Sequence, residues 1–147
     1  MLEWLSGFYP LISALTGMVV AQGLKTVYFY YRDRKLHLKY IFMSGGMPSS
    51  HSSLVSALTT AIAIKDGLAS SAFCISLIFS IIVIYDSGGV RHITGKQAQL
   101  INQIIEQLCT SQFSPKKLSE SWGHTPVEVA VGVGLGIVCA VVLAVIL

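Results

Sequence analysis

Long apolar segments constrain the fold of this chain more than any other feature. Residues 69–85 contain no charged side chain, and residues 126–147 contain only Glu128. Of the 147 residues, 53% are hydrophobic and 12% are charged, and the mean hydropathy is +0.68. About 20 apolar residues cross the hydrocarbon core of a bilayer as a helix. The sequence therefore predicts an all-α integral membrane protein with a single transmembrane domain over residues 1–147.

We expect four transmembrane helices, which cover residues 5–32, 53–64, 69–85 and 126–147. The second is too short to cross a bilayer unless the residues around Ser49 also belong to it. Asp66-Gly67 predicts a tight turn, so the second and third spans should form a helical hairpin. The aromatic cluster from Tyr28 to Tyr31 is typical of a membrane interface.

The polar stretch over residues 86–124 contains a predicted amphipathic helix. Its apolar residues recur at helical spacing and are Leu100, Ile101, Ile104, Ile105 and Leu108. Thr94, with Gln97 three residues later, should begin this helix as a capping box. We expect the helix to lie on the membrane surface.

The distribution of charge predicts the orientation in the membrane. Four spans place residues 32–50 and 86–124 on one side, and both ends of the chain on the other. The first side carries most of the basic residues, namely Arg32, Arg34, Lys35, Lys39, Arg91, Lys96, Lys116 and Lys117. By the positive-inside rule this is the cytoplasmic face, here expected in a bacterial cytoplasmic membrane. The net charge of +3 is small and indicates no nucleic-acid partner.

The string Gly-Gly-Met-Pro-Ser-Ser-His-Ser at residues 45–52 is the most informative motif. Gly45 and Gly46 free the backbone for positive φ, and Ser49 or Ser50 is a natural helix N-cap. The free amides of a helix N-terminus favour an anion such as phosphate, and His51 would stand beside it. The alternative is an ordinary capped helix that carries a histidine by chance.

A second motif of the same design begins the last span. Thr125 is the expected N-cap, and His124 and Glu128 are four residues apart. A carboxylate there could hold the imidazole in one tautomer and raise its nucleophilicity. The alternative is structural, because Thr125 and Glu128 also form the pattern of a capping box.

Basic residues at the ends of the spans could bind the same anion. Lys25 and Arg32 are two helical turns apart and share one face, although Lys25 could instead snorkel to the interface. Asp86 could orient Arg91 or simply cap the exit of the third span. The topology brings Lys25, Arg32, His51, Arg91 and His124 to one face of the membrane. Two histidines and several fixed cations suit phosphoryl transfer without a metal or another cofactor.

With these residues in view, the chain resembles the divergent branch of the type 2 phosphatidic acid phosphatase superfamily, the membrane proteins related to acid phosphatases and vanadium-dependent haloperoxidases. The resemblance rests on residues 45–52, on Tyr-Asp and Gly-Val-Arg within residues 85–91, on Gly95, Gln97-Ala98 and Asn102, and on residues 123–129. In the superfamily signatures, Asp33 replaces a proline and Ser50 replaces a glycine. The third signature is split between Arg91 and the pair His124 and Glu128.

The resemblance implies roles for these residues. His124 would be the nucleophile that forms a phosphohistidine, Glu128 its orienting partner and His51 the general acid. His92, next to Arg91, could compete for one of the histidine roles. The implied substrate is a lipid phosphomonoester in the bilayer, and phosphatidylglycerophosphate, phosphatidic acid and polyprenyl phosphates are all compatible.

Three other functions stay open. A non-catalytic member of the same fold would bind anionic lipid headgroups in the same basic pocket. Gly132 and Gly136 form a Gly-x-x-x-Gly face that suits a transporter or channel subunit, or helix packing within the bundle or in a homodimer. A metal site could be built from His51, His92 and His124, although nearby cations disfavour it.

Overall fold

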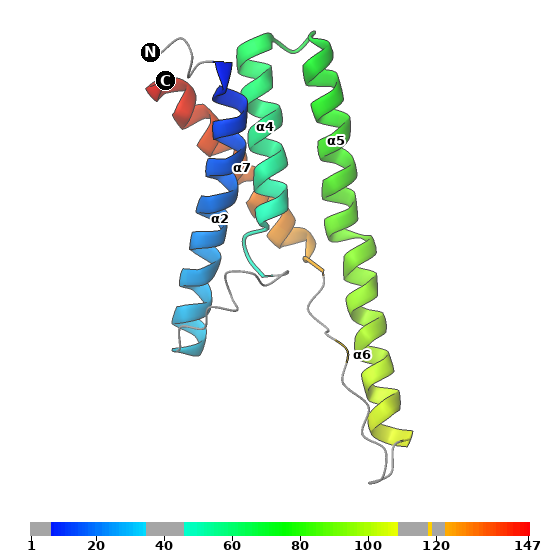
Figure 1. The fold of residues 1–147 in the computed structure, drawn as a ribbon. Coiled ribbons are helices and arrows are strands. Elements are labelled where there is room, and N and C mark those ends of the chain that lie inside the picture. The colour runs from blue at the N-terminus through cyan, green and yellow to red at the C-terminus, as the bar shows by residue number, and fades with distance from the viewer. Residues whose placement is uncertain (1–6, 35–45, 109–117, 119–122) are drawn as a thin grey trace.

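The computed structural model describes residues 7–34, 46–108, 118 and 123–147; within them, the side chains of residues 32, 33, 90–92 and 108 are not described. The helices in this part of the chain are α2 (Tyr9–Asp33), α4 (Ser50–Asp66), α5 (Ser71–Gly88), α6 (Val90–Leu108) and α7 (Pro126–Ile146) (Figure 1). All regular elements in the described residues are helices, which confirms the all-α prediction. Helical segments long and apolar enough to cross a membrane are Tyr9–Tyr31, Ser71–Gln107 and Pro126–Ile146.

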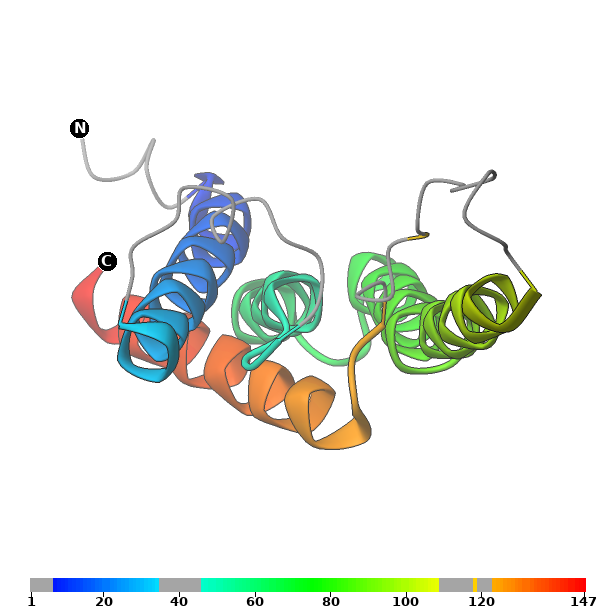
Figure 2. The same cartoon turned by 90° about the horizontal axis from the view of Figure 1, so that it is seen from below.

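The short helix α4 lies at the centre of the bundle. It has 17 residues, with Ser49 as N-cap and Gly67 as C-cap. Viewed along the bundle, α4 lies between α2 and α5, and α7 runs along one side of α2 and α4 (Figure 2). Helix α4 packs against all three neighbours, so the shortest apolar run of the sequence forms the core of the fold.

Hydroxyl groups connect α4 to each of its neighbours. The Ser53 hydroxyl donates to the carbonyl oxygen of Gly17 in α2 at 2.8 Å, and the Ser56 hydroxyl donates to that of Val133 in α7 at 3.1 Å. On the third side, the hydroxyls of Thr59 and Ser80 lie 2.7 Å apart, which links α4 to α5. In lipid, where apolar burial drives helix association only weakly, such hydrogen bonds and close packing hold helices together.

Glycines allow α7 to approach α4 closely. A Cβ atom at Gly132 would lie 2.5 Å from the carbonyl oxygen of Ser49, and one at Gly136 would overlap Ser53 and Ser56. Both glycines therefore serve packing inside the bundle. This explains the Gly-x-x-x-Gly motif without a channel or transporter.

The amphipathic helix begins earlier than predicted. Thr94 is not its N-cap, because α6 already begins at Val90. Gly89 joins the two helices: its N–H donates to Tyr85 at the end of α5 at 2.8 Å, and its carbonyl accepts from the amide of Ile93 at 3.1 Å. With one residue closing α5 and opening α6, no separate capping box is needed, and Thr94 lies inside the helix.

The ends of the helices are arranged as the sequence predicts. The start of α2 and the end of α7 lie near the turn between α4 and α5, whereas α4 and α7 begin at the opposite end of the bundle, where α2 finishes (Figure 1). Helix α6 continues nearly in line with α5 and extends beyond this end. A helix in line with a spanning helix does not lie flat on a membrane surface, so this arrangement differs from the predicted interfacial position. The motif-bearing ends of α4 and α7 thus share one end of the molecule.

Candidate functional site

The start of α4 is built by Ser49. Its extended backbone makes it the N-cap, and its side-chain oxygen accepts from the amide of Ser52 at 3.4 Å and from the Ser52 hydroxyl at 2.9 Å. Ser49 is fully buried and Ser50 is 8% exposed. Of the two N-cap candidates in the sequence, the structure therefore selects Ser49. His51 follows in the same first turn, and its side chain is exposed.

The start of α7 carries the second histidine. Thr125 is the N-cap, with Pro126 in the first helical turn, as predicted. The Thr125 amide donates to Oε2 of Glu128 at 2.9 Å, and the Glu128 amide donates to the Thr125 hydroxyl at 3.4 Å. The predicted capping box is therefore present, and it engages the Glu128 carboxylate.

His124, immediately before this cap, is held by α5. Its side chain is buried, with 2% exposed. The His124 amide donates to the carbonyl oxygen of Ser87 at 3.3 Å, and Nδ1 of its ring lies 3.2 Å from the Ser87 hydroxyl. Ser87 itself is 3% exposed, in the last turn of α5. The backbone and the ring of His124 are both fixed by one residue of a neighbouring helix.

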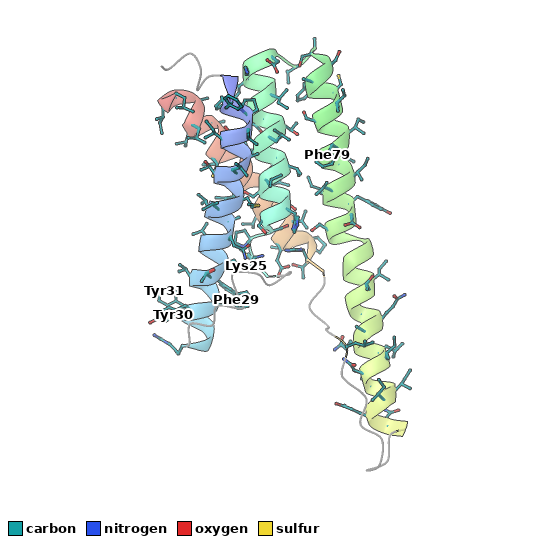
Figure 3. The ribbon with its side chains drawn as sticks, in the orientation of Figure 1. Lys25, Phe29, Tyr30, Tyr31 and Phe79 are labelled. Atoms are coloured by element: carbon teal, nitrogen blue, oxygen red, sulfur yellow. The ribbon has the colours of Figure 1, made fainter. Side chains whose placement is uncertain are left out.

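Lys25 is enclosed by the protein rather than by solvent. Its side chain is only 1% exposed, which rules out a snorkelling position. Figure 3 shows Lys25 and Phe29 on the side of α2 that faces the bundle, and Tyr30 and Tyr31 on the other side. Of the aromatic cluster, Phe29 is thus buried, whereas Tyr28, Tyr30 and Tyr31 are exposed.

The loop before α4 covers this lysine. Gly46 has φ +86°. A Cβ atom at Gly46 would lie 2.8 Å from Cζ of Phe29 and 3.9 Å from Cδ of Lys25. A residue with a side chain would therefore meet both backbone strain and the Phe29 ring. The positive φ predicted for Gly46 is confirmed, and the close approach of Gly46 to α2 also requires a glycine at this position.

Electrostatic attraction and backbone contact bring these elements together. The Ser49 amide donates to the carbonyl oxygen of Glu128 at 3.1 Å, so α4 and α7 begin side by side. The carboxylate of Glu128 also attracts the ammonium of Lys25. One end of the bundle therefore combines a buried cation, a buried imidazole and two helix N-termini, which together favour an anion.

The structure gathers part of the predicted site. Lys25, Gly46, Ser49, Ser50, His124 and Glu128 come together, with His51 in the adjoining turn. Asp86 lies in the last turn of α5, half-buried and next to Ser87. Arg32 and Arg91 lie in helices, but their side chains, like that of His92 and all of Gly45, are outside the described part of the structure. The catalytic and binding roles of all these residues stay predictions.

Sequence reasoning missed Ser87 and Phe29. Ser87 lies directly after Asp86, and its local sequence does not distinguish it from the other serines of α5. Phe29 was grouped with the interfacial tyrosines, yet it is four residues after Lys25 and so shares its helical face. That spacing was the available signal for Phe29. For Ser87, only the packing of α5 against α7 shows its contact with His124.

Comparison with known proteins decides the family. The sequence profile described as the divergent PAP2 family matches residues 8–139. The chain belongs to the divergent PAP2 family. This family assignment confirms the resemblance that the motifs indicate. The chain is also 38% identical over 155 aligned positions to the uncharacterized membrane protein YuiD of Bacillus subtilis (strain 168), covering 97% of this chain and 98% of that protein. No solved structure matches the chain. The matched region begins one residue before α2 and ends within α7, so it includes all of the bundle except the last turns of α7.

Proposed function

We propose that this divergent PAP2 protein is a lipid-phosphate phosphatase that hydrolyses a phosphomonoester headgroup. The observation that carries the proposal is the burial of Lys25 and His124 at the junction where α4 and α7 begin. A buried lysine and a buried histidine are costly for a membrane protein to keep, and such groups mark functional sites. Family membership supports the same chemistry.

The chemistry proceeds through a phosphohistidine. Nε2 of His124 attacks phosphorus, so an N–P bond forms while the bond from phosphorus to the lipid oxygen breaks. His51 donates a proton to the departing lipid alkoxide. Water then attacks the phosphohistidine, His51 accepts its proton, and inorganic phosphate leaves with His124 restored.

The remaining site residues bind the phosphoryl group. Lys25, Arg32 and Arg91 neutralise its charge, and the N-terminus of α4 at Ser49 and Ser50 attracts it through the positive end of the helix dipole. None of these steps requires a metal or a cofactor. Phosphatidylglycerophosphate, phosphatidic acid and polyprenyl phosphates all present the required phosphomonoester.

The test is phosphate release by purified protein in mixed micelles with each of the three lipid phosphates. We expect release with at least one of them, and its loss in a His124→Ala variant. Ser76→Ala is the matched control, because Ser76 is a buried serine whose hydroxyl bonds only within α5, to Phe73. Binding of the lipids without release by wild type would instead support a non-catalytic headgroup-binding protein.

We also propose that the site faces the cytoplasm of a bacterial cell. The basic residues of the sequence segments that connect α2 to α4 and α6 to α7 support that orientation. The chain end at Leu147 lies at the opposite end of the bundle. A reporter enzyme that is active only outside the cytoplasm should therefore be active when it is fused after Leu147. Activity of a cytoplasm-specific reporter at this position would reverse the orientation.

A further inference from the structure

Ser87 is the hydrogen-bond partner of the His124 ring. Two contacts connect His124 to Ser87: amide to carbonyl at 3.3 Å and Nδ1 to hydroxyl at 3.2 Å. Neither contact involves the carboxylate that follows His124 in the sequence. The ring therefore turns its Nδ1 edge toward α5, and Nε2 is the nitrogen left to face another group.

Glu128 is engaged in a different interaction. Its Oε2 accepts from the Thr125 amide at 2.9 Å, and its own amide closes the capping box. This reciprocal cap defines the first turn of α7. A carboxylate held in this way stabilises the helix and attracts Lys25, but it is not the group seen next to Nδ1.

We infer that Ser87 is the positioning residue of the nucleophile: its hydroxyl fixes the orientation and the tautomer of His124 in the role that a carboxylate would otherwise have. This inference rests on the proposed phosphatase function. The single juxtaposition behind it is the Ser87 hydroxyl beside Nδ1 of His124, both side chains being almost completely buried.

The surroundings of Ser87 suit this role. Ser87 lies in the last turn of α5. A Cβ atom built on the next residue, Gly88, would lie 3.5 Å from Cγ2 of Val129 in α7. The end of α5 is therefore in contact with the first turn of α7. A hydroxyl on this packed helix end cannot move far, so the direction of its hydrogen bond is defined before substrate binds.

The proposed attack through Nε2 sets the position of the proton on the ring. A neutral imidazole can attack phosphorus through Nε2 only if Nε2 carries the lone pair, and then Nδ1 carries the proton. Nδ1–H donates to the Ser87 oxygen in that state. When the N–P bond forms, the ring becomes cationic and the same hydrogen bond strengthens, because its donor is now charged.

Steady-state kinetics of phosphate release test the inference. Ser87→Ala should lower kcat about twofold to tenfold with KM unchanged, because the variant loses the strengthening of this hydrogen bond as the ring becomes cationic. Ser87→Thr, which keeps the hydroxyl, should restore part of the rate, and Ser76→Ala should behave as wild type. Glu128→Gln can still form the capping box and should affect kcat less than Ser87→Ala. A larger loss in Glu128→Gln, with Ser87→Ala unaffected, would overturn the inference while the phosphatase function stands.

Nitrogen NMR of the histidines gives a readout that does not depend on turnover. The chain has four histidines, so the His124 signals are assigned by their loss in His124→Ala. We expect the Nδ1–H tautomer at His124 in wild type, and a shift toward the Nε2–H tautomer in Ser87→Ala. A wild-type Nε2–H tautomer, or identical spectra for the two proteins, would refute the positioning role. If wild type releases no phosphate from any lipid but this NMR shift occurs, the contact is real and the proposed reaction fails.

Discussion

The amide of Ser49 donates a 3.1 Å hydrogen bond to the carbonyl oxygen of Glu128, and this bond joins the first turns of two helices that are far apart in the sequence. Ser49 is the N-cap of α4, and Glu128 completes the cap of α7. The position of one histidine-bearing helix start thus depends on the other. Substitutions that separate these turns should impair the site even when they touch neither histidine.

Gly132→Ala is expected to separate them. Its Cβ atom would lie 2.5 Å from the carbonyl oxygen of Ser49, so α7 must move away from α4. Forced overpacking of this kind costs about 1 to 3 kcal/mol of folding stability. Gly134→Ala is the control on the same helix, since its Cβ atom would meet no described heavy atom within 4 Å. Thermal unfolding in detergent should show a lower Tm for Gly132→Ala alone, and equal values would argue against tight α4–α7 packing.

Gly46→Ala should damage the site through the loop that covers Lys25. The new methyl group would lie 2.8 Å from the Phe29 ring, and the backbone has φ +86°. Gly67→Ala is the control, because Gly67 has nearly the same backbone conformation, with φ +84°. Gly67 lies at the other end of α4, and its Cβ atom would meet no described heavy atom within 4 Å. Backbone strain should cost both variants about 1 kcal/mol of stability, and overpacking against Phe29 should destabilise Gly46→Ala further. Only Gly46→Ala should also lose phosphate release, and a similar loss in both would show that strain alone is responsible.

Lys25→Met should abolish most phosphate release without unfolding the protein. Methionine keeps the buried aliphatic stem and removes the cost of burying a charge, and the Glu128 carboxylate that attracts Lys25 is only half-buried, so no fully buried charge is left unpaired. Loss of one group that stabilises transition-state charge typically lowers kcat about a hundredfold or more. Lys65→Met is the control, because Lys65 is exposed at the far end of α4 and donates to the carbonyl oxygen of Gly7. Full activity in Lys25→Met would remove Lys25 from the proposed site.

The hydroxyl contact between α4 and α5 should have a measurable interaction energy. Thr59→Val preserves shape but removes the 2.7 Å contact with Ser80, which still donates to the carbonyl oxygen of Val55. A double-mutant cycle of Thr59→Val and Ser80→Ala should give a coupling of about 0.6 kcal/mol in favour of the bond. A coupling of zero would mean that the contact between the two hydroxyls does not itself stabilise the pairing of α4 with α5.

The fold could be predicted largely because apolar length and capping are local properties. The spans followed from uncharged runs, and the cap at Thr125 followed from side chains three residues apart. The junction at Gly89 is harder to predict. A pair of glycines indicates that a helix ends, but only the backbone hydrogen bonds show that one residue separates α5 from α6. This is why the start of the amphipathic helix was predicted at Thr94 rather than Val90.

The site was less predictable because its contacts join distant parts of the chain. Lys25 has the same local sequence whether it snorkels or is buried, and the choice depends on the loop that carries Gly46. Likewise, Ser87 and His124 are 37 residues apart, so neither residue indicates the other. Helix periodicity shows which residues share a face, but it does not show which helix covers that face.

The hydroxyl-rich centre has a consequence for how the protein is made. Helix α4 is synthesised long before α7, yet the Ser56 hydroxyl shares its hydrogen bond between Ser53 in α4 and Val133 in α7. Until the last helix enters the bilayer, α4 presents polar groups to neighbouring lipid or to the insertion machinery. Chains that stop before Pro126 should therefore be retained by membrane quality control and degraded, although three of their apolar segments have already been inserted.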